Sequence, residues 1–154
     1  MSANVIVVVE QEFDHPRPRV FRAWTAPEEM SQWRGSPGWH VERESVTSDL
    51  RTGGKHHHVK VRDDDPSVRV TTDAVFTEYF DPDVFVARQR ITGDSGIDPN
   101  ESLELRVEFT AMGGDRTLVR IVQGPYDPAV AQYHAAGWEK ELARLATYLD
   151  GGQA

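Results

Sequence analysis

Apolar and polar positions divide the chain into helical segments near its two ends and strand-length segments between them. Residues 5–9 form an unbroken β-branched run, which favours a first strand. After Pro16, which suits a helix start, Val20, Phe21 and Trp24 recur at helical spacing. This pattern predicts a short helix that packs one apolar face.

A second short helix is expected directly after the first. Thr25 stands where its side chain can cap a new helix, Glu28 occupies the reciprocal position of a capping box, and Pro27 fits the first turn. Met30 and Trp33 supply the apolar face of this helix. The chain is therefore expected to begin with a strand and two short helices.

The middle of the chain consists of strand-length segments separated by glycine, proline and aspartate turns. We expect strands at residues 41–50, 55–62, 68–80, 84–92, 103–111 and 117–123. Short turns between successive strands predict an antiparallel meander. Residues 103–110 alternate strictly between apolar and polar, so this strand has one buried face that another element must cover.

The covering element is predicted near the C-terminal end. Asp127 and Pro128 form a helix start, and apolar residues recur at helical spacing from Val130 to Leu149. This pattern gives a helix of about six turns. Gly137 inside the helix should cost about 1 kcal/mol relative to alanine, which indicates a close approach of backbone or ligand at that point.

Length and composition narrow the class of protein. The 154 residues fit one domain, so residues 1–154 are expected to form a single α+β unit. Lys and Arg total 17 against 25 Asp and Glu, a net charge of -8 that repels nucleic-acid phosphates and anionic membranes. We therefore expect neither nucleic acid nor a membrane as partner. The absence of cysteine suits a reducing compartment and predicts a cytoplasmic protein.

Four segments carry a family resemblance: FRAWTAPE at residues 21–28, WRG at 33–35, DLRTGGK at 49–55 and GWEKELARL at 137–145. In this order they resemble the bacterial family named after the activator of the ninety-kilodalton heat-shock chaperone's ATPase. That family belongs to the START-like, or Bet v 1-like, helix-grip superfamily. The resemblance implies a curved antiparallel sheet of six to seven strands, two short N-terminal helices and a long C-terminal helix enclosing a cavity.

The chain departs from the family pattern at positions that face the expected cavity. Arg34 stands where family members commonly show a second tryptophan. His56 and His58 stand where aromatic or apolar residues are usual. The resemblance therefore implies a cavity wall that is more polar here than in its relatives.

His56 and His58 are two apart on a predicted strand, so both project from the same face. Two imidazoles could share an ion, but the sequence fixes no third ligand, and we expect no metal and no cofactor. If Val59 and Val61 point inward, the two histidines face water. If the family pattern holds, they line the cavity, where a neutral imidazole can hydrogen-bond a ligand.

Glu78 has two possible roles. The resemblance places a recurring acid in its segment, where a buried carboxylate with a raised pKa could act as acid or base. Alternatively, Glu78 pairs with Arg88 or Arg90 on the neighbouring strand, because the tight turn at residues 81–83 brings the two strands together. The turn favours the ion pair.

The expected cavity has aromatic and apolar walls from both the sheet and the C-terminal helix. Its predicted lining is Trp24, Trp33, Trp39, His56, His58, Phe76, Val107, Phe109, Val119, Ile121, Tyr133, His134, Trp138 and Leu142. Such side chains around a concave site suit a compact apolar or aromatic ligand, although for Trp138 plain core packing is the simpler interpretation. We therefore expect a protein that binds a small hydrophobic or aromatic molecule.

Two alternatives remain open. An enzyme of the polyketide-cyclase kind found on related folds would use Glu78, His56 or His58 as acid or base. The family's name suggests instead an interaction module that stimulates a chaperone ATPase through its outer surface, although the chain has no room for a second chaperone-binding domain. The edge strand at residues 5–9 and the exposed short helices would support a homodimer.

Overall fold

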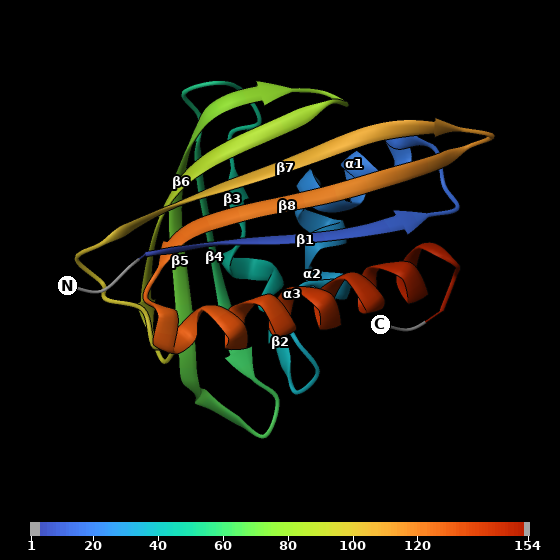
Figure 1. The fold of residues 1–154 in the computed structure, drawn as a ribbon. Helices are drawn as coiled ribbons and strands as arrows, with labels where there is room; N and C mark the ends of the chain where they lie inside the picture. Colours follow the sequence, from blue (N-terminus) through green and yellow to red (C-terminus); the bar gives the residue numbers. More distant parts are fainter. Residues whose placement is uncertain (1–3, 153–154) are drawn as a thin grey trace.

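The computed structural model describes residues 4–152, in the element order strand, two helices, sheet and helix (Figure 1). The helices are α1 (Arg17–Thr25), α2 (Pro27–Trp33), the single 3-10 turn η1 (Arg43–Ser45) and α3 (Pro128–Leu149). The strands are β1 (Val5–Phe13), β2 (Trp39–Val41), β3 (Thr47–Ser48), β4 (Lys55–Arg62), β5 (Asp65–Phe80), β6 (Val84–Gly93), β7 (Ser102–Gly113) and β8 (Arg116–Tyr126). Within residues 4–152, no helix is long and apolar enough to cross a membrane.

All strands belong to one antiparallel sheet with the order β1-β8-β7-β6-β5-β4-β2, and β3 pairs with β4 beside this path. Successive strands from β4 to β8 are neighbours, and the last strand, β8, also pairs with the first strand, β1. The sheet curves around α3, which crosses its concave face (Figure 1). The predicted α+β helix-grip fold is confirmed.

Helix α3 begins and ends where the sequence predicts. Asp127 is its N-cap, and the carboxylate accepts the backbone N–H of Ala129 at 2.8 Å. Pro128 follows in the first turn, where the missing N–H has no intrahelical partner to lose. Leu142 and Leu145 are completely buried. The helix thus supplies the cover that the alternating strand β7 requires.

Residues 41–50 do not form the single strand that the sequence predicts; they form the end of β2, the turn η1 and β3. Ser45 makes the break, because its hydroxyl donates to the carbonyl of Glu42 at 2.7 Å and accepts the N–H of Val59 at 2.8 Å. A side-chain hydroxyl here replaces a ladder hydrogen bond, which strand propensity does not reveal. The turn helps to bury a small separate cluster of Met30, Val41 and Val46.

The junction between α1 and α2 differs from the predicted capping box. Thr25 is the last residue of α1, and its hydroxyl donates to the carbonyl of Phe21 at 2.9 Å. Ala26 is the N-cap of α2 and provides no side-chain bond. Pro27 does occupy the first turn, as predicted. The hydroxyl prefers the preceding turn because it is buried there against its own helix.

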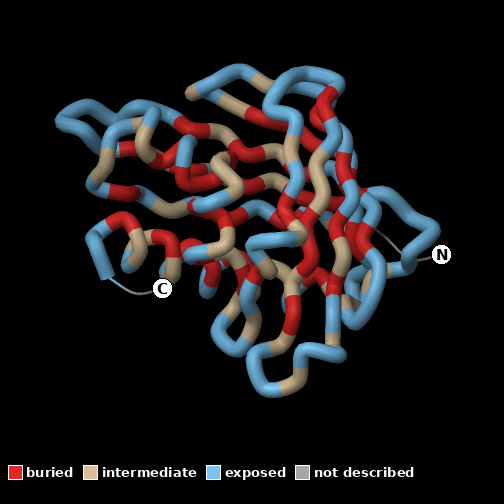
Figure 2. Tube along the Cα trace, turned by 180° about the vertical axis from the view of Figure 1, so that it is seen from behind, coloured by how far each residue is buried: buried red, intermediate tan, exposed pale blue. Residues whose placement is uncertain are grey.

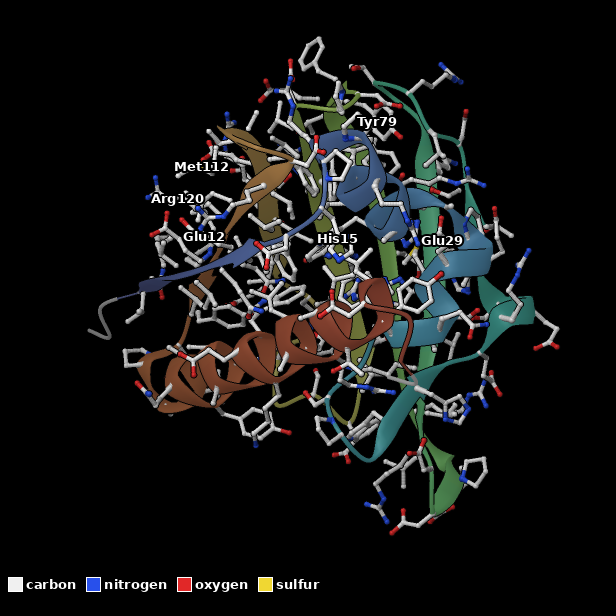
Figure 3. The ribbon with its side chains drawn as sticks, turned by 90° about the vertical axis from the view of Figure 1, so that its right-hand side faces the viewer. Glu12, His15, Glu29, Tyr79, Met112 and Arg120 are labelled. Carbon is white, nitrogen blue, oxygen red and sulfur yellow. The ribbon has the colours of Figure 1, made fainter. Side chains whose placement is uncertain are left out.

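Glu29 ties α1, α2 and α3 together. Its buried carboxylate accepts hydrogen bonds from Arg19 Nη1 at 2.6 Å and from the Tyr148 hydroxyl at 2.9 Å, and Arg22 Nε lies 3.1 Å away. Figure 3 shows Glu29 beside the last turns of α3. These contacts anchor the C-terminal end of α3 to both short helices.

An aromatic core fills the space between the short helices and the sheet. Phe21 packs edge-to-face on Phe109, and Trp24 on Trp33, each pair with ring centroids 4.9 Å apart. Trp33 is completely buried, and its indole Nε1 donates to the carbonyl of Ala23 at 2.8 Å. Figure 2 shows buried and exposed residues alternating along the strands. The concave face of the sheet therefore carries the core.

Phe21→Ala is expected to lower the free energy of unfolding by about 3–5 kcal/mol, because the truncated side chain leaves a cavity in the aromatic core. Urea denaturation followed by circular dichroism measures this loss. The matched control is Phe80→Ala, because Phe80 is 53% exposed and its truncation should cost less than about 0.5 kcal/mol. Equal losses for the two variants would contradict the assigned core.

Candidate functional site

A cavity of about 230 Å³ lies between the concave face of the sheet and α3. Its lining comes from β2, β4, β5, β6 and β8, from the loop after β6, from the segment between α2 and β2, and from residues 133–141 of α3. The last two turns of α3 take no part, because they pack on the core and on the short helices (Figure 1). The cavity therefore sits at one end of the groove that the helix covers.

The structure places part of the predicted lining at this cavity. The predicted residues that line it are Trp39, His58, Tyr133, His134 and Trp138. The others lie outside the lining: Trp24, Trp33, His56, Phe76, Val107, Phe109, Val119, Ile121 and Leu142. Apart from His56, which stands beside His58, these belong to the packed core. Trp24 and Trp33 belong to α1 and α2, and rings from α1 pack over the sheet residue Phe109.

Aromatic rings form one wall of the cavity. Tyr126 of β8 and His134 of α3 stack with their ring centroids 4.7 Å apart and their planes only 14° from parallel. Trp138 lies one helical turn further along α3 and is 6% exposed. Tyr133 is 69% exposed and stands at the mouth. Flat rings on this wall suit a flat ligand.

A network of buried amides forms the floor. Gln123 of β8 donates from Nε2 to Gln89 Oε1 of β6 at 2.8 Å. The amide oxygen of Gln123 accepts the indole N–H of Trp138 at 2.7 Å and the hydroxyl of Tyr126. Burial raises the pKa of Tyr126, so the phenol stays a donor near neutral pH. The network therefore fixes the orientation of both rings.

Gln89 and Gln123 were not among the predicted site residues. Both occupy inward-facing positions of strands whose other inward residues are apolar, such as Ala87, Ile91 and Ile121. A polar residue at an inward position of an alternating strand needs a buried partner. A polar residue at an inward position in each of two strands is therefore the sequence signal that could have identified Gln89 and Gln123.

Arg34 is held in an aromatic cage above the cavity. Its guanidinium carbon lies 5.5, 5.6 and 5.2 Å from the ring centroids of Trp24, Trp33 and Trp138, respectively. Its Nε donates to the buried carboxylate of Glu141 at 3.2 Å. The position where relatives are expected to carry a second tryptophan therefore holds a cation stacked among tryptophans.

Glu141 fixes the segment between α2 and β2 against α3. The same carboxylate oxygen that accepts Arg34 also accepts the backbone N–H of Gly35 at 2.5 Å. Burial alone would raise the pKa of Glu141, but the positive charges of Arg34 and Lys60 and the hydrogen bonds outweigh it and hold the pKa below its ordinary value. Arg144, one turn later on α3, donates to the carbonyls of Gly35 at 2.7 Å and Trp39 at 2.9 Å. These contacts position Trp39 at the cavity.

The side chains of His56 and His58 share the inner face of β4. His56 Nε2 lies 2.8 Å from His58 Nδ1, and His56 Nδ1 lies 3.0 Å from the hydroxyl of Ser48. Burial, with the nearby charge of Arg34, lowers the pKa of His56 to about 4 and that of His58 well below its ordinary value. Both rings are therefore neutral near pH 7. No group of three or more His, Cys, Asp or Glu side chains in the described range is placed to hold a metal ion.

Glu78 lies on the outer face of the sheet, away from the cavity. Its side chain is 47% exposed and lies 3.6 Å from Arg106 Nη1. The expected pairing with Arg88 or Arg90 does not form, because the strand register sets Glu78 opposite Val86, whereas Arg88 stands opposite Val75 and Arg90 opposite Asp73. Glu78 is therefore excluded as an acid or base in this cavity.

A curved antiparallel sheet, closed by a long C-terminal helix over a cavity, defines a helix-grip domain. The chain belongs to the family described as Activator of Hsp90 ATPase homolog 1-like protein, whose family model matches residues 14–150. No curated protein sequence matches the chain.

Solved structures share this fold at low sequence identity. A protein from Silicibacter pomeroyi aligns with a TM-score of 0.81 at 18% identity, over 95% of this chain and 98% of that chain. A protein from Arthrobacter aurescens aligns with a TM-score of 0.80 at 18% identity, over 96% of this chain and 87% of that chain. A protein from the dynemicin biosynthetic locus aligns with a TM-score of 0.73 at 20% identity, over 98% of this chain and 49% of that chain. Such identities establish the fold, and the function depends on the site.

The low pKa of His56 makes stability depend on pH. The unfolded chain takes up a proton on His56 below the ordinary pKa of 6.5, whereas the folded chain takes it up only below about 4. Protonation between these values favours the unfolded state, so the free energy of unfolding falls as the pH drops through this window. His56→Gln should remove on the order of 1–3 kcal/mol of that fall.

Urea denaturation of the wild-type chain and of His56→Gln at several pH values across the window tests this expectation. At pH 7 the comparison gives the cost of losing the contacts to Ser48 and His58, which is separate from the pH slope. An unchanged slope in the variant would show that folding does not alter the protonation of His56.

Proposed function

We propose that the chain binds a small, flat aromatic molecule in the cavity between the sheet and α3. The observation that carries this proposal is the combination of a preformed cavity of about 230 Å³ with an aromatic wall and a satisfied amide floor. Ligand pockets commonly combine flat apolar surfaces with a few fixed polar groups. The cavity is slightly below the usual volume range of about 300–1,000 Å³, so a compact ligand fits best.

Gly137 supports the same proposal. It lies inside α3, lines the cavity, and sits next to Trp138. A Cβ at this position would meet only the hydroxyl of Ser36, at an ordinary distance of 3.5 Å. Packing against the protein therefore does not require glycine here, although glycine costs the helix about 1 kcal/mol. Since packing does not explain the glycine, we infer that the missing side chain leaves space for a ligand.

A direct test is native mass spectrometry of gently purified protein, followed by the same protein after denaturation. A bound small molecule that is released on denaturation would identify the ligand class. Protein that stays unliganded after expression under several growth conditions, and that also fails to bind naphthalene-2-carboxamide in calorimetry, would contradict the proposal.

Blocking the cavity should abolish binding without affecting the fold. Ala136 is partly buried and lines the cavity, so Ala136→Trp should weaken binding of naphthalene-2-carboxamide at least about tenfold, by occupying the ligand's space. The matched control is Ala143→Trp, because Ala143 is exposed on the same helix and lies outside the lining. Equal affinities for the two variants would place the ligand elsewhere.

One observation favours an enzyme of the polyketide-cyclase kind as a second candidate. Ser48, His56 and His58 form a chain of hydrogen bonds that ends at the cavity, and His58 Nε2 is the ring nitrogen left to meet a ligand. As that nitrogen takes a proton from a ligand, the Nδ1 proton of His58 passes to His56 Nε2 and the Nδ1 proton of His56 passes to the hydroxyl oxygen of Ser48. Ser48 releases its own hydroxyl proton to solvent, which its partial exposure permits. Both rings stay neutral, as the nearby Arg34 requires.

The two candidates differ in the fate of the ligand. For an enzyme, a ligand recovered from the His58→Gln variant should differ in mass or structure from the one recovered from the wild-type chain, because the variant retains unreacted substrate. Recovery of the same molecule from both proteins would leave only the binding function.

A further inference from the structure

Lys60 contributes a positive charge to the cavity that no ion pair neutralises. It lies on the inner face of β4, two residues after His58, and its Nζ is 5.6 Å from the ring centroid of Trp39. Across residues 4–152, no carboxylate oxygen lies within 4.0 Å of Lys60 Nζ, although many other basic side chains of the protein have such a partner. Lys60 is partly buried and lines the cavity.

The other charges around the cavity do not cancel that of Lys60. Arg34 and Glu141 form a direct pair, and the carboxylate also accepts the N–H of Gly35. Asp94 and Lys140 are both exposed where they border the cavity, and they carry opposite charges. The histidines on β4 are neutral, as described above. The interior of the site thus carries one positive charge in excess, in a chain whose net charge is -8.

We propose that this cavity selects an anion, and that the ligand is a flat aromatic carboxylate whose carboxylate group pairs with Lys60 while its ring lies against Trp39 and the aromatic wall. This inference rests on the proposed binding function and deepens it, since it names the chemical class of the ligand. A partly buried cation without a partner is costly, and a bound carboxylate would supply that partner.

The surroundings of Lys60 fit this role. Burial lowers the pKa of Lys60, with Glu141 opposing and Arg34 adding to that shift. The negative charge of a bound carboxylate would raise the pKa of Lys60 again and so stabilise its charged form. The Trp39 ring near Nζ brings an aromatic face next to the cation, so one ligand can use both the charge and the ring. The net charge of -8 repels anions from the rest of the surface, which disfavours binding of an anion outside this cavity.

A pair of probes with the same shape tests the inference. Naphthalene-2-carboxylate and naphthalene-2-carboxamide differ mainly in charge, and their dissociation constants can be measured by calorimetry on the full chain. We expect the wild-type chain to bind the carboxylate about ten- to hundredfold more tightly, the range of a charge-assisted hydrogen bond. Lys60→Met should remove that preference while still binding the carboxamide, and Lys60→Arg should retain much of it.

The control variant is Lys55→Met, which removes a positive charge from an exposed position of the same strand outside the cavity lining and should keep the preference. Thermal melting shows whether each variant is folded. Equal affinities of the wild-type chain for the two probes would overturn the anion inference and leave the binding function standing, and this comparison requires no variant. A preference that survives in folded Lys60→Met would overturn the role of Lys60. Failure of both probes to bind would count against the proposed function itself.

Discussion

The cavity depends on the hydrogen bonds that the buried carboxylate of Glu141 accepts from Arg34 and Gly35. The carboxylate joins α3 to the segment after α2 by accepting both a guanidinium and a backbone N–H, and Arg144 extends the same junction by one helical turn. This junction adds to the pairing of β2 with β4 in holding Trp39 over the end of the sheet. A buried pair of this kind contributes little net stability, but loss of one partner costs about 3–5 kcal/mol. Its main effect is on geometry, because it fixes which backbone atoms border the cavity.

The fold could be predicted from the sequence because the strand alternation, the helical periodicity and the helix start and stop signals all indicate the same arrangement. The alternation along residues 103–110 required a cover, and the amphipathic segment behind Asp127 and Pro128 supplied one with clear start and stop signals. Errors occurred where a single hydroxyl decides the local structure. Ser45 breaks an otherwise plausible strand, and Thr25 bonds its own helix instead of capping the next. Propensity does not contain this information, since it depends on which partner is in reach.

The site could be predicted only in part, and the reason is geometric. The sequence shows which residues point toward the inside of the sheet, but not where α1 and α2 fill that inside. Phe109 and Ile121 therefore became core, whereas Trp39 and Trp138 reached the cavity. Conversely, the sequence pattern did not predict Lys60 and Gln89 as site residues, because each is a single polar residue within a strand. Only the strand register shows that the two side chains lie on the same concave face and can both line the cavity.

The cavity and the core share few residues, and this separation has an evolutionary consequence. The polar side chains of the cavity wall, such as Lys60, Thr72 and Gln89, lie outside the main apolar cluster. Substitutions that destabilise a protein strongly arise chiefly in packed cores, and such losses restrict which changes selection tolerates. Under the proposed function, a change of ligand requires altering only a few wall residues, while the aromatic core remains untouched and continues to hold the fold.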